Sequence, residues 1–161
     1  MKKMIITALL LGLGAGPVAA ADADPAGVGF PQGYRDWTHV KSMVINAGHP
    51  LYEAVGGIHS IYGNPEAIGA YQSGKKFPDG SVIVFDLFEA VDKDNAIAEG
   101  NRKAVIVMQK DGGKFTTTDG WGYQVFDATG KGTLDAKAAT ECHACHTQVK
   151  QEDFVFSAWR D

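Results

Sequence analysis

The feature that most constrains this chain is a pair of cysteines near its C-terminus, followed directly by a histidine. Cys142, Cys145 and His146 form the pattern C-x-x-C-H, which is the attachment pattern of c-type haem. Residues three and four positions apart lie on the same face of a helix. Both thiols can therefore reach the vinyl groups of one haem, and His146 can reach its iron. We predict one haem c, attached covalently through both cysteines, with His146 as the metal ligand.

Two other interpretations of the cysteine pair stay open from the sequence. A disulfide needs no trailing histidine, and a redox-active C-x-x-C usually follows a strand in a thioredoxin-like pattern. Here residues 127–140 are polar and loop-like. A zinc site with His143 as a further ligand normally draws on a second ligand pair, and the chain has no other cysteine. The spacing and the trailing histidine together favour haem attachment.

The N-terminus has the pattern of a secretory signal peptide. Lys2 and Lys3 form a basic start, residues 4–13 are apolar, and residues 18–20 are small, as at a cleavage site. The apolar run is too short to span a bilayer comfortably. We predict cleavage near Ala20 and export to the periplasm, outside the cytoplasm, where haem-attachment machinery acts on bacterial c-type cytochromes. Residues 21–33 are then a flexible lead-in, and residues 34–161 form a single c-type haem domain.

Composition limits the class of partner. The chain has 161 residues and is 45% hydrophobic, which suits one globular domain with its own core. The formal charge is −4, and residues 1–20 contribute two lysines and no acid, so the mature chain carries about −6. An acidic chain of this kind argues against nucleic acid and against anionic membrane surfaces as partners.

The order of secondary structure predicts an α+β, mainly β fold. β-branched and aromatic runs predict strands over residues 37–45, 58–62, 81–88, 103–110 and 121–126. Asn64 and Pro65 begin a short helix that ends at Gly74, because these residue types suit an N-cap, a first helical position and a C-cap.

A second helix, over residues 136–149, carries the haem motif, and residues 154–156 form a short strand or an apolar plug. We therefore predict an antiparallel β-sheet with a short helix and a C-terminal haem-bearing helix. Common small electron-transfer cytochromes differ from this order, because their motif lies near the N-terminus of a mostly helical chain. No Met or His follows His146 to serve as a downstream ligand.

Short motifs spread over most of the mature chain resemble the cytochrome P-460 and cytochrome c′-beta family. In order they are residues 34–37 (YRDW), 61–66 (IYGNPE), 77–84 (FPDGSVIV), 120–121 (GW) with Phe126, 142–146 (CHACH) and 155–157 (VFS). The resemblance implies a cytochrome P-460-like fold, which is an antiparallel sheet with flanking helices. It also implies a homodimer.

The resemblance further implies what faces the haem on the distal side. Enzymatic members oxidise hydroxylamine and nitric oxide, and they carry a Lys cross-linked to the haem and a Glu near the distal face. These positions align here with Phe85 and Ile106, which can form no amine cross-link and relay no proton. The pattern is similar to the cytochrome c′-beta branch, whose distal pocket is apolar and capped by Phe. It implies a non-enzymatic cytochrome that binds NO and CO, with Phe85 and Ile106 lining the haem pocket.

Two other functions stay open. One is a hydroxylamine or nitric oxide oxidoreductase of the cytochrome P-460 type, which needs the cross-linking Lys. The other is an electron-transfer cytochrome with a Met or His sixth ligand. The candidates are Met43, Met108, His39, His49 and His59, and His59 is the best of the histidines because it precedes an apolar strand, whereas His49 is expected in a solvated turn. A Met inside an apolar strand is more often a packing residue than a ligand. His143, between the two cysteines, is expected to point away from the haem.

Overall fold

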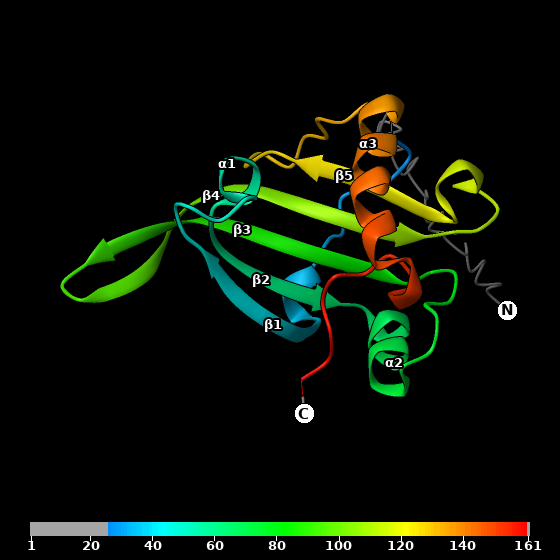
Figure 1. Ribbon diagram of the computed structural model, residues 1–161, viewed down its shortest axis with the longest axis horizontal. Helices are drawn as coiled ribbons and strands as arrows, with labels where there is room; N and C mark the ends of the chain where they lie inside the picture. Colours follow the sequence, from blue (N-terminus) through cyan, green and yellow to red (C-terminus); the bar gives the residue numbers. More distant parts are fainter. Residues whose placement is uncertain (1–25, 161) are drawn as a thin grey trace, which may run out of the picture.

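The computed structural model describes residues 26–160, so the predicted signal peptide and its cleavage site lie outside the described residues. Five strands form one antiparallel sheet, in which each strand pairs with its neighbour in sequence (Figure 1). They are β1 (Thr38–Ile45), β2 (Gly57–Gly63), β3 (Val82–Lys93), β4 (Ala96–Lys110) and β5 (Trp121–Phe126). The predicted α+β, mainly β fold with an antiparallel sheet is confirmed.

Three α-helices accompany the sheet in the described residues: α1 (Tyr52–Val55), α2 (Pro65–Ser73) and α3 (Ala136–His146). The sequence signals for α2 are confirmed, because the Asn64 side chain accepts a hydrogen bond from the Ala67 amide at 3.1 Å and Gly74 ends the helix in the left-handed region at φ 63°. Asp135 caps α3 in the same way, accepting from the Ala138 amide at 2.8 Å.

Short 3₁₀ helices fill several of the connections: η1 (Tyr34–Asp36), η2 (Thr116–Thr118) and η3 (Thr147–Glu152). The helix predicted over residues 136–149 is therefore shorter as an α-helix, because its last turn continues as η3 after His146. Tight 3₁₀ turns are frequent where an α-helix ends. The break places the haem motif in the last turn of α3.

β3 and β4 extend well beyond the predicted strands and form a long hairpin that projects from one end of the sheet (Figure 1). Lys93 pairs with Ala96 next to its turn, where Asp94 and Asn95 have φ values of 56° and 63°. Two consecutive residues with positive φ match the twist that a tight hairpin requires. The prediction missed this extension because the polar residues along it lack a strand-like hydrophobic pattern.

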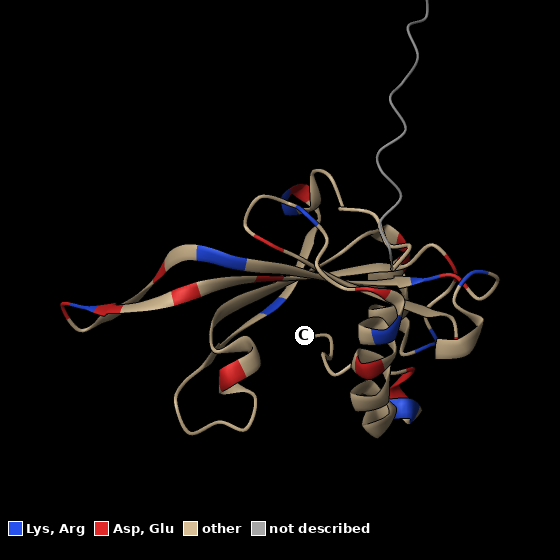
Figure 2. Cartoon of the chain, turned by 90° about the horizontal axis from the view of Figure 1, so that it is seen from above, with Lys and Arg blue, Asp and Glu red and all other residues tan. Residues whose placement is uncertain are grey.

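Alternate residues of the strands build two packed faces. The front face centres on a buried cluster that includes Val40, Ile61, Ala67, Ala70, Phe77, Ile83, Met108, Trp121, Tyr123, Phe154 and Val155. The back face holds Val28, Tyr34, Val84, Val105, Val107 and Phe126. Figure 2 shows α1 and α3 projecting from the same face of the sheet, with η1 on the other.

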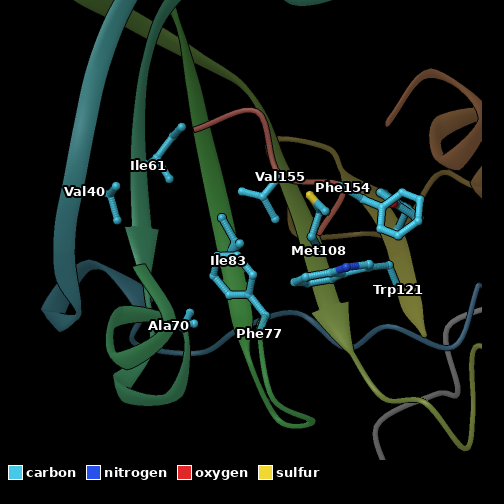
Figure 3. Packing of buried hydrophobic residues seen from close by; sticks show 11 residues of the cluster. Val40, Ile61, Ala70, Phe77, Ile83, Met108, Trp121, Phe154 and Val155 are labelled. Atoms are coloured by element: carbon cyan, nitrogen blue, oxygen red, sulfur yellow. The ribbon is translucent and has the colours of Figure 1, made fainter. Parts of the chain in front are cut away.

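The C-terminal segment completes part of the front face. Phe154 and Val155 are buried, and Figure 3 shows both on the same side of the sheet as Met108 and Trp121. These residues do not form a strand. Of the two forms predicted for residues 154–156, the structure has the apolar plug at Phe154 and Val155, whereas Phe156 is 55% exposed. This plug follows η3, which joins it to the helix that carries the haem motif.

Candidate functional site

Cys142, Cys145 and His146 lie together in the last turns of α3. Cys142 is half-buried and packs against the front cluster, and burial raises the pKa of its thiol. Cys145 is exposed, and neither cysteine is in a disulfide. The helix therefore presents two free thiols one turn apart at the border of the front face, with His146 beside them.

His146 is held by one short hydrogen bond and by aromatic contacts. Its Nδ1 lies 2.7 Å from the main-chain oxygen of Phe154, and its ring centre lies 5.1 Å from that of Tyr123 and 5.0 Å from that of Phe156. A carbonyl oxygen can only accept, so Nδ1 carries the proton and Nε2 keeps its lone pair. Burial lowers the pKa of His146, which favours the neutral ring that binds metals.

The sheet brings Phe85 and Ile106 directly opposite each other. Phe85 on β3 pairs with Ile106 on β4, and their other neighbours in the same row are Ile61 and Val125. Paired residues of an antiparallel sheet point to the same side, and Phe85 packs against the front cluster. Both side chains are only half-buried. Phe85 and Ile106 are 21 residues apart in the sequence. In the sheet they form one apolar surface on the face that carries α3.

This geometry agrees with the comparison to known families. The sequence model of the cytochrome P460 family matches residues 31–157, which is most of the chain. The chain belongs to the cytochrome P460 family. No curated protein sequence matches it.

Membership of the cytochrome P460 family makes this chain a haem cytochrome, and the residues present fit that cofactor. A c-type haem needs two thiols on one helical face and a histidine with a free ring nitrogen, and α3 supplies both. The apolar macrocycle also needs apolar neighbours, and the half-buried Phe85 and Ile106 face the same side. The described residues contain no group of three or more His, Cys, Asp or Glu side chains that could hold a bare metal ion.

The other residues considered as ligands lie in different surroundings. Met108 is buried in the front cluster, as expected of a packing residue. Met43 is 49% exposed, so it is not a core packing residue in this chain. His49 lies in a turn and accepts a hydrogen bond from the Leu51 amide at 3.1 Å.

His59 has the contact that sequence reasoning missed. Its ring stacks on Phe85 with centres 3.9 Å apart and planes inclined by 16°. The residue is 2% exposed, and its buried Nδ1 has no hydrogen-bond partner. Burial lowers the pKa of His59 to about 4, and Lys41 adds to this effect. The side chain is therefore a neutral ring packed beneath Phe85, a contact that depends on pairing between β2 and β3 and that no local motif indicates.

His143 is buried rather than free at the surface of α3. Its Nδ1 lies 3.1 Å from the Tyr123 hydroxyl and its Nε2 lies 3.1 Å from a carboxylate oxygen of Asp119. The two contacts join α3 to β5 and to the turn before it. His143 thus fixes the helix on the sheet, a role that the C-x-x-C-H pattern does not reveal because the pattern leaves this position variable.

No helix in residues 26–160 combines the length and the apolar character that crossing a bilayer requires.

Proposed function

We propose that this protein is an exported cytochrome with one haem c, attached through Cys142 and Cys145 and bound at iron by His146. We further propose that the opposite side of the iron is open and apolar, and that it binds NO and CO. The physiological role is then the sensing or scavenging of NO. In this proposal the protein belongs with the cytochrome c′-beta branch of its family and does not act as an enzyme.

The arrangement on α3 supports the proximal side of this proposal. With the Nδ1 proton donated to Phe154, His146 offers Nε2 as the ligand atom, and the two cysteines precede it in the same turns of the helix. Iron held by one histidine keeps a second axial position for an external ligand. The residues proposed to attach the haem and to bind its iron therefore all lie within residues 142–146.

The pairing of Phe85 with Ile106 is the observation that supports an apolar surface on the distal side of the haem. Neither side chain has an atom that can bind iron, donate a hydrogen bond or take up a proton. Dioxygen and anions gain most from a polar distal partner, whereas NO and CO are neutral diatomics that need none. His59 adds no charge at neutral pH, since burial lowers its pKa to about 4. An apolar surface of this kind favours NO and CO over anionic ligands.

The same two residues separate this proposal from the oxidoreductase alternative. An enzyme of the cytochrome P-460 type needs an amine at the position of Phe85 and a proton acceptor at the position of Ile106. The electron-transfer alternative needs a sixth protein ligand instead, and His59 on β2 is a candidate that stacks on Phe85. The three functions therefore predict different absorption spectra for the haem.

The deciding experiment is the absorption spectrum of the purified holoprotein, oxidised and reduced, with and without CO or NO. We expect a five-coordinate ferrous haem that changes on addition of either gas. A six-coordinate low-spin ferrous spectrum would support the electron-transfer alternative. A red-shifted Soret band with a third covalent bond, detected by mass spectrometry, would support the oxidoreductase.

A pair of variants on β3 locates the distal surface. Phe85→Lys places an amine on the front face and is expected to change both the spectrum and the binding of CO. Val91→Lys places the same side chain on the exposed part of the hairpin, where Val91 is 42% exposed, and is the matched control. If both variants bind CO as the wild type does, Phe85 does not line the pocket.

Export and assembly are further parts of the proposal. We propose that cleavage near Ala20 releases the mature protein into the periplasm, and that it forms a homodimer there, as the family resemblance implies. Cell fractionation with N-terminal sequencing tests the first point. Light scattering on the mature holoprotein tests the second.

A further inference from the structure

We propose that Asp153 is a positioning residue for the proximal histidine. Asp153 holds a left-handed turn whose next carbonyl, that of Phe154, fixes the Nδ1 proton of His146, and the turn thereby sets the strength of the iron–histidine bond. This inference rests on the proposed role of His146 as the iron ligand. It concerns residues that lie outside the C-x-x-C-H motif.

The turn at residues 153 and 154 has an unfavourable backbone. Asp153 has φ 50° and ψ 40°, and Phe154 has φ 67°. The left-handed region is tolerable for Asp but strongly disfavoured for an aromatic residue. Such a conformation persists only when surrounding contacts hold it in place.

Both carboxylate oxygens of Asp153 are used to hold this turn. Oδ2 accepts a hydrogen bond from the Phe77 amide at 2.9 Å, and Oδ1 lies 3.1 Å from Nζ of Lys110. The Asp153 main-chain oxygen accepts from Nε1 of Trp121 at 2.9 Å. Asp153 is 8% exposed. Three separate parts of the chain, from before β3, from β4 and from β5, thus converge on one buried residue.

The consequence falls on His146. Because Asp153 and its neighbour are fixed, the Phe154 oxygen stays 2.7 Å from Nδ1. A histidine that donates the proton on its non-ligating ring nitrogen is held in one tautomer and one orientation, and it becomes a stronger metal ligand. The other ring contacts, to Tyr123 and Phe156, offer no acceptor of comparable geometry. Loss of Asp153 therefore loosens the one hydrogen bond that orients the ring.

The test compares Asp153→Ala with Asp94→Ala in the holoprotein. Asp94 is the same residue type in a similar left-handed conformation, φ 56°, at the exposed hairpin tip. For Asp153→Ala we expect the iron–histidine stretching band of the ferrous haem, measured by resonance Raman, to move to lower frequency and broaden. The reduction potential should rise, and acid should displace His146 from iron at least about 10-fold more readily, which is typical of losing such a partner. Asp94→Ala should match the wild type in all three measurements.

Two milder variants keep the test decisive if Asp153→Ala does not fold. Asp153→Asn suits a left-handed residue and can still accept from Phe77, but it loses the ion pair with Lys110. Lys110→Met removes the same ion pair from the other side. Each should shift the stretching band in the same direction by a smaller amount. If His146→Ala leaves the spectrum unchanged, the proposed function fails. If His146 is the ligand and none of the three variants moves the band, the role of Asp153 is overturned.

Discussion

The two faces of the sheet are built from alternate residues of the same strands, yet the described chain covers them to different extents. On the back face Val84 and Val105 are fully buried, beneath a segment that contributes Val28 and Tyr34. On the front face the next residues, Phe85 and Ile106, are only half-buried, although α3 and the C-terminal plug lie on the same side. The apolar strand residues of the back face are therefore fully covered by the chain. Those of the front face are covered only in part, so an apolar surface stays accessible there.

This difference in burial shows that an apolar residue in a strand can belong either to the core or to a surface that binds an apolar group. Residues 82–88 read as one buried run, because every residue on both faces of β3 there is apolar except Asp86. On the back face, other residues of the chain, among them Val28 and Tyr34, cover the apolar side chains. A covalently attached, apolar cofactor requires partly covered apolar side chains and free thiols, and Phe85 and Cys142 both pack against the front cluster. The following predictions test this contrast between the faces, in order of decreasing effect.

The largest effect is expected at the thiols beside the front face. Replacing Cys142 and Cys145 together by Ser should abolish covalent haem attachment completely, because no other cysteine exists in the chain. Haem staining after denaturing electrophoresis, with the mass of the intact protein, measures this. A back-face variant, Val105→Ala, should keep its haem. Covalent haem in the double Ser variant would contradict the proposed attachment.

The same truncation on the two faces should affect stability unequally. Phe126 is buried on the back face at 2% exposure, so Phe126→Ala should lower the free energy of unfolding by about 3–5 kcal/mol. Phe85→Ala removes a half-buried ring and should cost roughly 1–2 kcal/mol. Only Phe85→Ala should change the spectrum of the CO complex. Denaturant unfolding and absorption spectra measure the two effects, and the reverse pattern would refute the contrast between the faces.

A buried charge on the back face should matter for stability and not for haem. Asp86 is 1% exposed; Arg35 donates to it from Nη2 at 2.9 Å, and Arg102 Nε lies 3.1 Å away. Asp86→Ala leaves two partly exposed guanidinium groups without this partner, so we expect a loss of about 2–3 kcal/mol in unfolding free energy. Asp92→Ala, at an exposed position of the same strand, should change it by less than about 0.5 kcal/mol. A changed haem spectrum in Asp86→Ala would show that the two faces are coupled.

The effect that is smallest at neutral pH is a pH dependence of stability from His59 on the front face. Burial lowers the pKa of His59 from 6.5 to about 4, so the unfolded chain binds this proton at a higher pH than the folded chain does. Stability is therefore complete above pH 6.5 and is lost as the pH falls toward 4, by about 2.5 kcal/mol at pH 4.5. His59→Phe should remove this part of the difference between pH 7 and pH 4.5. His49→Phe, at an exposed position, should retain it, and equal pH dependence in both variants would show that His59 is not the cause.

Much of the fold and the core of the site could be predicted because the signals are local. Cys142, Cys145 and His146 occupy adjacent turns of one helix, so their spacing alone predicts that they act together. Asn64, Pro65 and Gly74 set the ends of α2 through contacts within a few residues. The β-branched and aromatic run over residues 121–126 correctly predicted β5, which contributes Trp121 and Tyr123 to the front cluster. Family resemblance supplied Phe85 and Ile106 as a pair of positions.

Tertiary structure decided which distant residues meet. Phe85 lies opposite Ile106 and stacks on His59 because of strand register, and a periodic pattern gives the face of a side chain without naming its partner. Asp153 reaches Phe77 across 76 residues and Lys110 across 43, so nothing near it in the sequence indicates its contacts. The spacing of Cys142, Cys145 and His146 is enough to predict where a haem attaches. The packing of the sheet decided what holds His146 in place and what lies on the same face, because those contacts form only when distant segments fold together.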